Sequence, residues 1–263
     1  MRRLSYRQVL ELVAGKPVDE LVLVGGQATN AWAEALGVAN EHEEGVYGAA
    51  LSADIDFLGL APAAIKLAAA IGGEVQVAGM DRHTPNAAVV TIDFDGEKNT
   101  IDVLHSLQGF SDGGLQEVRA WAATPEMPAD LENKLRVMHP LHCLQAQLEN
   151  VYGSLNRRER EDGERNANRV RLLCEIARRT IQRYLDEGEI DSARLMIERL
   201  YELARSVPAL RARTTDGIDL VEGHWLDAKL GGDFLEKRLP QLQRYLKDKL
   251  EKDERRRLNT AKK

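Results

Sequence analysis

The chain has 263 residues and a mass of 29.3 kDa, enough for one large or two modest domains at roughly 150 residues per domain. Hydrophobic residues make up 43% and charged residues 30%, values that exclude a disordered, collagen-like or disulfide-stapled protein. Two cysteines and six histidines argue against structural zinc modules. No apolar run reaches the ~20 residues that span a bilayer. We therefore expect a cytoplasmic protein without membrane contact, with Cys143 and Cys174 reduced.

Charge is distributed unevenly along the chain. The net charge is −6, but residues 1–150 hold ten basic against 21 acidic residues, whereas residues 151–263 hold 26 against 21. An acidic half followed by a basic half suits carboxylates that bind metal ions beside a surface that meets a phosphorylated partner. Long C-terminal helices with salt-bridged faces would give the same basic excess.

Apolar and β-branched runs bounded by Gly or Asp dominate the region between residues 20 and 105 and predict an α/β fold. Helices are expected over 27–36 and 61–71, and the polar segment 95–99 predicts a hairpin. The expected strands are 21–24, 55–58, 74–77, 88–94 and 100–104.

Helical periodicity dominates after residue 138. This change predicts an α+β domain with a mixed sheet over residues 1–138, followed by an all-helical domain over residues 139–263. Pro208 and the polar run 213–217 predict a loop, as do Gly113 and Gly114, and the charged tail from Glu251 is expected to be mobile. The expected helices are 141–152, 166–188, 192–207 and 234–254, the last interrupted at Pro240.

The first chemical signal is the segment Val22-Leu23-Val24-Gly25-Gly26-Gln27, a strand that breaks at two glycines and continues as a helix. Glycine lets the backbone approach a ligand closely, and the helix N-terminus favours an anion such as a phosphate. Turns of this kind also occur solely for tight packing.

A pair of carboxylates follows in Ser52-Ala53-Asp54-Ile55-Asp56-Phe57-Leu58. In a strand, the side chains of Asp54 and Asp56 project from one face with their Cα atoms about 6.6 Å apart, so both can bind the same Mg²⁺ ions. Adjacent like charges cost stability unless a cation or hydrogen-bond donors compensate them. A strand-end pair that caps the next helix is the alternative interpretation.

A third carboxylate lies in Thr100-Ile101-Asp102-Val103-Leu104. If this strand pairs beside 55–58, at the usual spacing of about 4.8 Å, Asp102 joins Asp54 and Asp56 in a divalent-metal site. Asp93 is the rival third ligand because it also lies in an apolar strand. We favour Asp102, whose flanking residues are the more continuously apolar.

Together these segments resemble the nucleotidyltransferase fold of the DNA polymerase β superfamily, and within it the AbiEii-like toxins and related bacterial proteins. The resemblance covers roughly residues 15–150. It implies a nucleoside triphosphate held through Mg²⁺ or Mn²⁺ and transfer of a nucleotidyl group to an acceptor. Asp54, Asp56 and Asp102 would be the catalytic and metal-binding residues. The nucleotide would contact Gly25, Gly26, Gln27 and Ser52.

The sequence also departs from this family pattern. Gln147 stands where family members often carry a lysine in the helix after the sheet, and Arg160 with Asp162 lacks the spacing of the family's Arg-Asp pair. Glutamine can hydrogen-bond a phosphate but brings no charge. Either arginines such as Arg157, Arg165 or Arg169 supply the missing charge, or catalysis is weak.

Two functions from different classes are therefore expected. The first is a Mg²⁺-dependent nucleotidyltransferase acting on a hydroxyl acceptor, which could be tRNA, a protein side chain or a small molecule. The alternative is a weakly active or inactive nucleotide-binding or partner-binding protein on the same fold. The family resemblance also implies toxin-like behaviour with an antitoxin protein as partner.

A second cluster of metal-ligating residue types occurs at His139, His142 and Cys143. With no further Cys or His nearby, these residues are better explained as packing in the core than as a zinc site.

Overall fold

The structure is a computed structural model that describes residues 5–38, 54–79, 84–94, 96–126, 134–153, 163–222 and 227–260. The chain divides into two compact units. Unit 1 comprises residues 1–147 and 164–176, and unit 2 comprises residues 148–163 and 177–263. The sequence placed a boundary between residues 138 and 139. The division differs because unit 1 also takes in most of one helix and the first half of the next.

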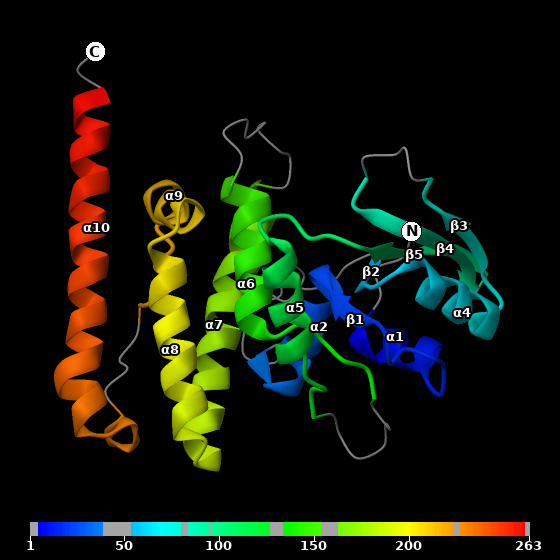
Figure 1. The fold of residues 1–263 in the computed structure, drawn as a ribbon, viewed down its shortest axis with the longest axis horizontal. Helices are drawn as coiled ribbons and strands as arrows, with labels where there is room; N and C mark the ends of the chain where they lie inside the picture. The colour runs from blue at the N-terminus through cyan, green and yellow to red at the C-terminus, as the bar shows by residue number, and fades with distance from the viewer. Residues whose placement is uncertain are drawn as a thin grey trace. The chain divides into compact units, whose positions relative to one another are not determined.

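Unit 1 is built on a five-stranded mixed sheet with the strand order β1-β2-β5-β4-β3 (Figure 1). The pairs β1–β2, β3–β4 and β4–β5 are antiparallel, and β2–β5 is parallel. The predicted mixed α/β class, the five strands and the hairpin between β4 and β5 are thus confirmed. The strands are β1 (Val22–Val24), β2 (Ile55–Leu58), β3 (Glu74–Val77), β4 (Asn86–Phe94) and β5 (Glu97–Leu104).

The two faces of this sheet differ in burial. Alternate residues of β2, β4 and β5 are fully or almost fully buried, among them Phe57, Val90 and Ile101. Helix α4 (Ala61–Ile71) packs along β3 and β4, and Gly73, which follows it, lies against Val90 and Ile92. The other face is less buried on β4 and β5 and carries Thr91, Asp93 and Asp102.

Helix α2 (Gly25–Ala35) starts directly where β1 ends and contacts β1 and β2. Its Trp32 Nε1 donates to the Met138 carbonyl at 2.8 Å, which fixes the helix against the segment before α6 (Pro140–Leu148). That segment also pairs with β1, because Leu23 N donates to Arg136 O and Met138 N donates to Leu23 O. Both β1 and α2 are therefore held against residues 136–138.

Two helices of unit 1 went unpredicted. Helix α1 (Tyr6–Val13) has a capping box in which Ser5 accepts from Gln8 N and the Gln8 side chain accepts from Ser5 N. Helix α5 (Asp112–Trp121) begins at Ser111, whose Oγ accepts from Gly114 N. The expectation of a simple turn at Gly113-Gly114 is wrong, because the N-cap allows both glycines to lie in the first helical turn.

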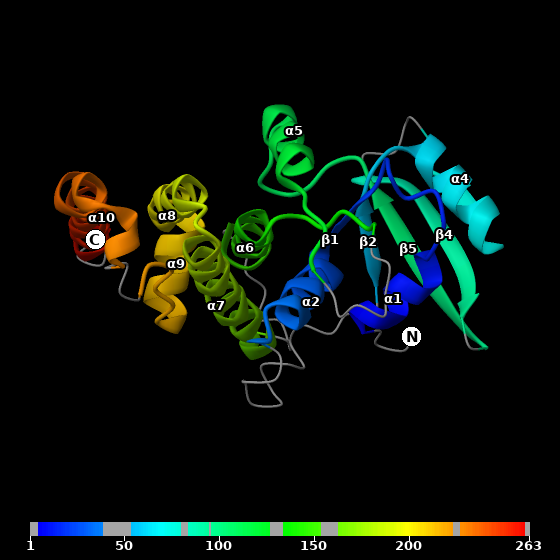
Figure 2. The same cartoon turned by 90° about the horizontal axis from the view of Figure 1, so that it is seen from below.

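Unit 2 is helical in the part that the structure describes. Residues 164–176 of helix α7 belong to unit 1 and its other residues to unit 2. Within unit 2, helices α8 and α10 contact each other (Figures 1 and 2). Among the described residues, no helix is long and apolar enough to cross a membrane. The elements are the π-helix η2 (Glu149–Gly153), α7 (Gly163–Glu187), α8 (Ile190–Ala204), α9 (Val207–Asp216), the 3₁₀-helix η3 (Ala228–Leu230), the π-helix η4 (Phe234–Arg238) and α10 (Leu239–Thr260).

One expectation for unit 2 is wrong, and a segment that is expected to be mobile is helical. The predicted loop at Pro208 and 213–217 is helix α9, capped by Ser206, and a proline in the first turn is compatible with a helix. The tail that was expected to be mobile from Glu251 is helical as far as Thr260. Ion pairs of the (i, i+4) type, such as Arg257 with Asp253, support this last stretch.

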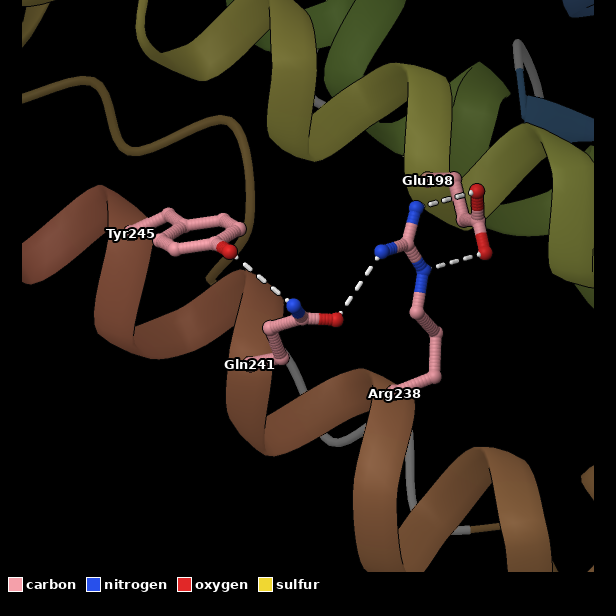
Figure 3. A network of polar contacts seen from close by, with 4 residues as sticks. All are labelled: Glu198, Arg238, Gln241 and Tyr245. Atoms are coloured by element: carbon pink, nitrogen blue, oxygen red, sulfur yellow. Dashed lines mark hydrogen bonds and ion pairs between the residues drawn. The ribbon is translucent and has the colours of Figure 1, made fainter.

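A polar network connects α8 to the start of α10 (Figure 3). Arg238 donates from Nε and Nη2 to the two carboxylate oxygens of Glu198, at 2.7 and 2.9 Å. Arg238 Nη1 donates to Gln241 Oε1, and Gln241 Nε2 donates to the Tyr245 hydroxyl. The negative charge of Glu198 is thus matched by two parallel hydrogen bonds from a cation.

Candidate functional site

Two of the three predicted carboxylates are direct neighbours in the sheet. Asp56 and Asp102 are register partners in the parallel pair β2–β5, so their side chains project from the same face of the sheet. Asp54 lies two residues before Asp56, just ahead of β2, and is exposed. The structure therefore gathers Asp54, Asp56 and Asp102 in one region, which we call the acid site.

The electrostatics of the acid site are those of crowded like charges. Burial, followed by the negative charges of Asp102 and Asp54, raises the pKa of Asp56 from 3.8 to about 7. Burial and the charge of Asp54 also raise the pKa of Asp102. Residues whose pKa is displaced by burial together with specific charged neighbours are candidates for functional sites.

The glycine turn lies directly against the acid site. Gly25 has a φ of +67°, and a Cβ atom at this position would overlap the Asp56 carboxylate. Val24, the residue before it, is the register partner of Asp56 in β1. Glycine is required here both for the backbone conformation and for the close approach of Asp56.

The four residues predicted to contact a nucleotide differ in their exposure to solvent. Gly25 is exposed, whereas Gly26 is buried and the side chain of Gln27 is fully buried. Asn30 Nδ2 and Gln27 Oε1 are 3.5 Å apart within α2. Ser52 lies outside the described residues. Gly25 is thus the member of this set whose backbone faces solvent beside the acids.

Arg169 brings a positive charge toward the acid site. It lies on the part of α7 that belongs to unit 1, and its charge acts to lower the pKa of Asp56 against the larger opposing effects. That an arginine supplies the charge missing at Gln147 stays a prediction. Arg165 lies one turn earlier on α7, and Arg157, Arg160 and Asp162 lie outside the described residues.

Asp93, the rival third ligand, lies apart from the acid site. It is an exposed residue of β4 that pairs with Lys98, whereas Asp102 pairs with Val89. The four-residue offset along the strand corresponds to about 13 Å at 3.3 Å per residue. The preference for Asp102 over Asp93 as the partner of Asp56 therefore agrees with the register.

Sequence reasoning missed Asn86, whose side chain also reaches the acid site. Asn86 Nδ2 donates to Asp102 Oδ1 at 3.2 Å. No sequence pattern pointed to this contact, because it depends on an irregular register between β4 and β5 at Asn86 and Ala88.

The cluster of His139, His142 and Cys143 is buried, as expected for core residues. Trp121 packs edge-on against His139, with ring centroids 5.3 Å apart, and Cys143 Sγ donates to the Met138 carbonyl. Burial, together with the neighbouring His142, lowers the pKa of His139 to about 3. Burial also raises the pKa of the Cys143 thiol, which keeps it protonated and unreactive.

Within the described part of the chain, no group of three or more His, Cys, Asp or Glu side chains is arranged to hold a metal ion. The three-carboxylate metal site therefore stays a prediction. Comparison of the chain with models of protein families, with curated proteins and with solved structures finds no match in any of the three.

Proposed function

We propose that the chain is a Mg²⁺-dependent nucleotidyltransferase that moves a nucleotidyl group from a nucleoside triphosphate to a hydroxyl acceptor. The observation that carries this proposal is the mostly buried Asp56 carboxylate. It lies between the exposed Gly25 backbone and the register partner Asp102. Burying a carboxylate beside two others is unfavourable for stability alone, so a function for the acid site explains it better.

The donor atoms of the acid site are of the kind that a hard divalent cation takes as ligands. Asp54, Asp56 and Asp102 would hold Mg²⁺ or Mn²⁺, because carboxylate oxygens are the donors that these ions prefer. The crowding that raises the pKa of Asp56 is the kind of repulsion that a cation relieves. When bound, the ion would neutralise phosphate charge and favour the deprotonated acceptor hydroxyl.

The roles of the chain's own residues follow from their positions. Asp102 Oδ1 accepts from Asn86, so we assign Oδ2 to the acceptor hydroxyl. Asp102 would take the hydroxyl proton while the acceptor oxygen bonds to the α-phosphorus and pyrophosphate leaves with the bridging oxygen. Gly25 and the start of α2 would contact the phosphates, and Arg169 would add positive charge.

A label-transfer assay tests this function. The full chain is incubated with Mg²⁺ or Mn²⁺, each nucleoside triphosphate labelled at the α-phosphate, and RNA, protein or small hydroxyl acceptors. We expect Asp56→Ala and Asp102→Ala to lose transfer by at least roughly 100-fold. Asp93→Ala is the matched control, because it removes an exposed acid from the same sheet, and it should retain full activity. Full activity in Asp56→Ala would refute the proposal.

The alternative, a nucleotide-binding or partner-binding protein without turnover, takes its support from Gln147 in place of lysine. Calorimetry with nucleoside triphosphates, with and without Mg²⁺, separates the two. Binding without transfer to any acceptor would favour the alternative. The toxin-like role, with an antitoxin partner, is tested by expression in bacteria, where growth arrest that depends on Asp56 is expected.

A further inference from the structure

A β-bulge in β4 determines which way the Asn86 side chain points. Ala88 pairs with Val103 of β5, but Asn86, two residues earlier, pairs with Leu104, so Ala87 is an extra residue. In a regular ladder, Asn86 would share the face of Ala88, which is fully buried. The bulge instead makes it the partner of Leu104, which lies on the same face as Asp102.

This change of face brings the amide to the acid site. Asn86 and Asp102 become diagonal neighbours across the strand pair, a separation that a long polar side chain can bridge. The contact is the 3.2 Å hydrogen bond from Asn86 Nδ2 to Asp102 Oδ1. A neutral donor lowers the repulsion among the carboxylates without neutralising any of them.

The segment before the bulge is fixed by a residue that follows β5. His105 N donates to the Pro85 carbonyl, and His105 Nε2 lies 2.9 Å from the Thr84 carbonyl, which can only accept. Thr84 Oγ1 in turn accepts from Asn86 N. These three bonds hold the backbone of Asn86 next to the strand that carries Asp102, so the amide is positioned before any ligand binds.

We propose that Asn86 is a positioning residue that fixes the orientation of Asp102 at the acid site, leaving Oδ2 of Asp102 directed to a divalent cation and the acceptor. This inference rests on the proposed function. Hydrogen-bond partners of metal-binding carboxylates act in this way, and their loss typically costs 10–100-fold in metal affinity.

Calorimetric titration of the full chain with Mn²⁺ tests the inference without relying on turnover. We expect Asn86→Ala to bind Mn²⁺ about 10-fold or more weakly than the wild type. The matched control is Asn99→Ala, which removes an amide from β5 that contacts Glu97 O, and it should bind within about 2-fold of the wild type. A thermal melt of each variant without metal checks folding.

The Mn²⁺ titration can overturn the positioning role of Asn86 in two ways. Wild-type affinity in a folded Asn86→Ala would overturn the positioning role while leaving the proposed function intact. If the wild type binds no Mn²⁺, the proposed function and this inference fail together.

Discussion

Asp56 in unit 1 and Glu198 in unit 2 are both partly buried carboxylates, but their surroundings have opposite charge. Asp56 lies beside two other acids, and burial and these charges raise its pKa to about 7. Glu198 accepts two hydrogen bonds from Arg238, which lower the pKa of the carboxyl group. The Glu198 carboxylate in turn raises the pKa of the Arg238 guanidinium.

This difference in the surrounding charges distinguishes the structural ion pair of Glu198 and Arg238 from the candidate functional site at Asp56. The network around Glu198 continues to Gln241 and Tyr245, and every charge in it has a partner (Figure 3). At the acid site the fold accepts an unfavourable ionised state instead. Such local costs are typical of positions kept for binding or catalysis.

The largest effect on stability is expected from Asp56→Asn. Ionised Asp56 destabilises the metal-free protein, so the variant should gain about 2–4 kcal/mol of unfolding free energy above pH 7.5, from the rise of the pKa from 3.8 to about 7. Below pH 3.8, Asp56 is protonated in both the folded and the unfolded state, so it does not lower the free energy of unfolding. As the pH rises from 3.8 to about 7, the unfolded state loses this proton first, and the free energy of unfolding of the wild type falls. The gain should therefore vanish near pH 4. Urea unfolding in chelator at pH 4 and pH 8 measures it, and equal stability at pH 8 would contradict the electrostatic account.

A smaller effect is expected from Gly25→Ala. The substitution forces alanine to a positive φ, which costs about 1–3 kcal/mol, and its Cβ would overlap Asp56. In an Asp56→Ala background the overlap disappears, so the same substitution should cost about 1 kcal/mol less. Thermal or urea unfolding of the wild type, the two single variants and the double variant measures this double-mutant cycle. An equal cost in both backgrounds would show that Gly25 is required for its backbone conformation only.

The smallest effect is expected from Glu198→Gln. Because Glu198 and Arg238 are partly solvent-exposed, losing the ion pair should cost only about 1 kcal/mol or less, and less at high salt. The lowered pKa means that this contribution is present above the ordinary carboxyl pKa of 4.5 and is lost as the pH falls. Asp233→Asn, in a fully exposed pair with Lys237, is the control and should change stability less. A cost of several kcal/mol would indicate that the network is structurally essential.

The five strands were predictable from sequence because each contains β-branched or apolar residues between clear breaks. The proximity of Asp56 and Asp102 was predictable only on the condition that their strands are neighbours in the sheet. The bulge that turns Asn86 was not, because a one-residue register shift leaves no compositional trace.

Helices α1, α5 and α9 were missed although each has a side-chain N-cap, at Ser5, Ser111 and Ser206. In α5 and α9, the glycines and the proline of the first turn led to the prediction of a turn and a loop, and the serine before each helix was not considered. Capping is therefore the signal that could have identified them.

Helix α7 runs without a break from unit 1 into unit 2, and Arg169 lies on the portion assigned to unit 1. A shortened chain that ends at the apparent domain border near residue 138 would keep every strand and all three acids but discard that arginine. Loss of activity in such a fragment could therefore result from the loss of Arg169 alone and would say nothing about the rest of the helical region. A truncation that tests the role of unit 2 has to retain the chain at least through residue 176.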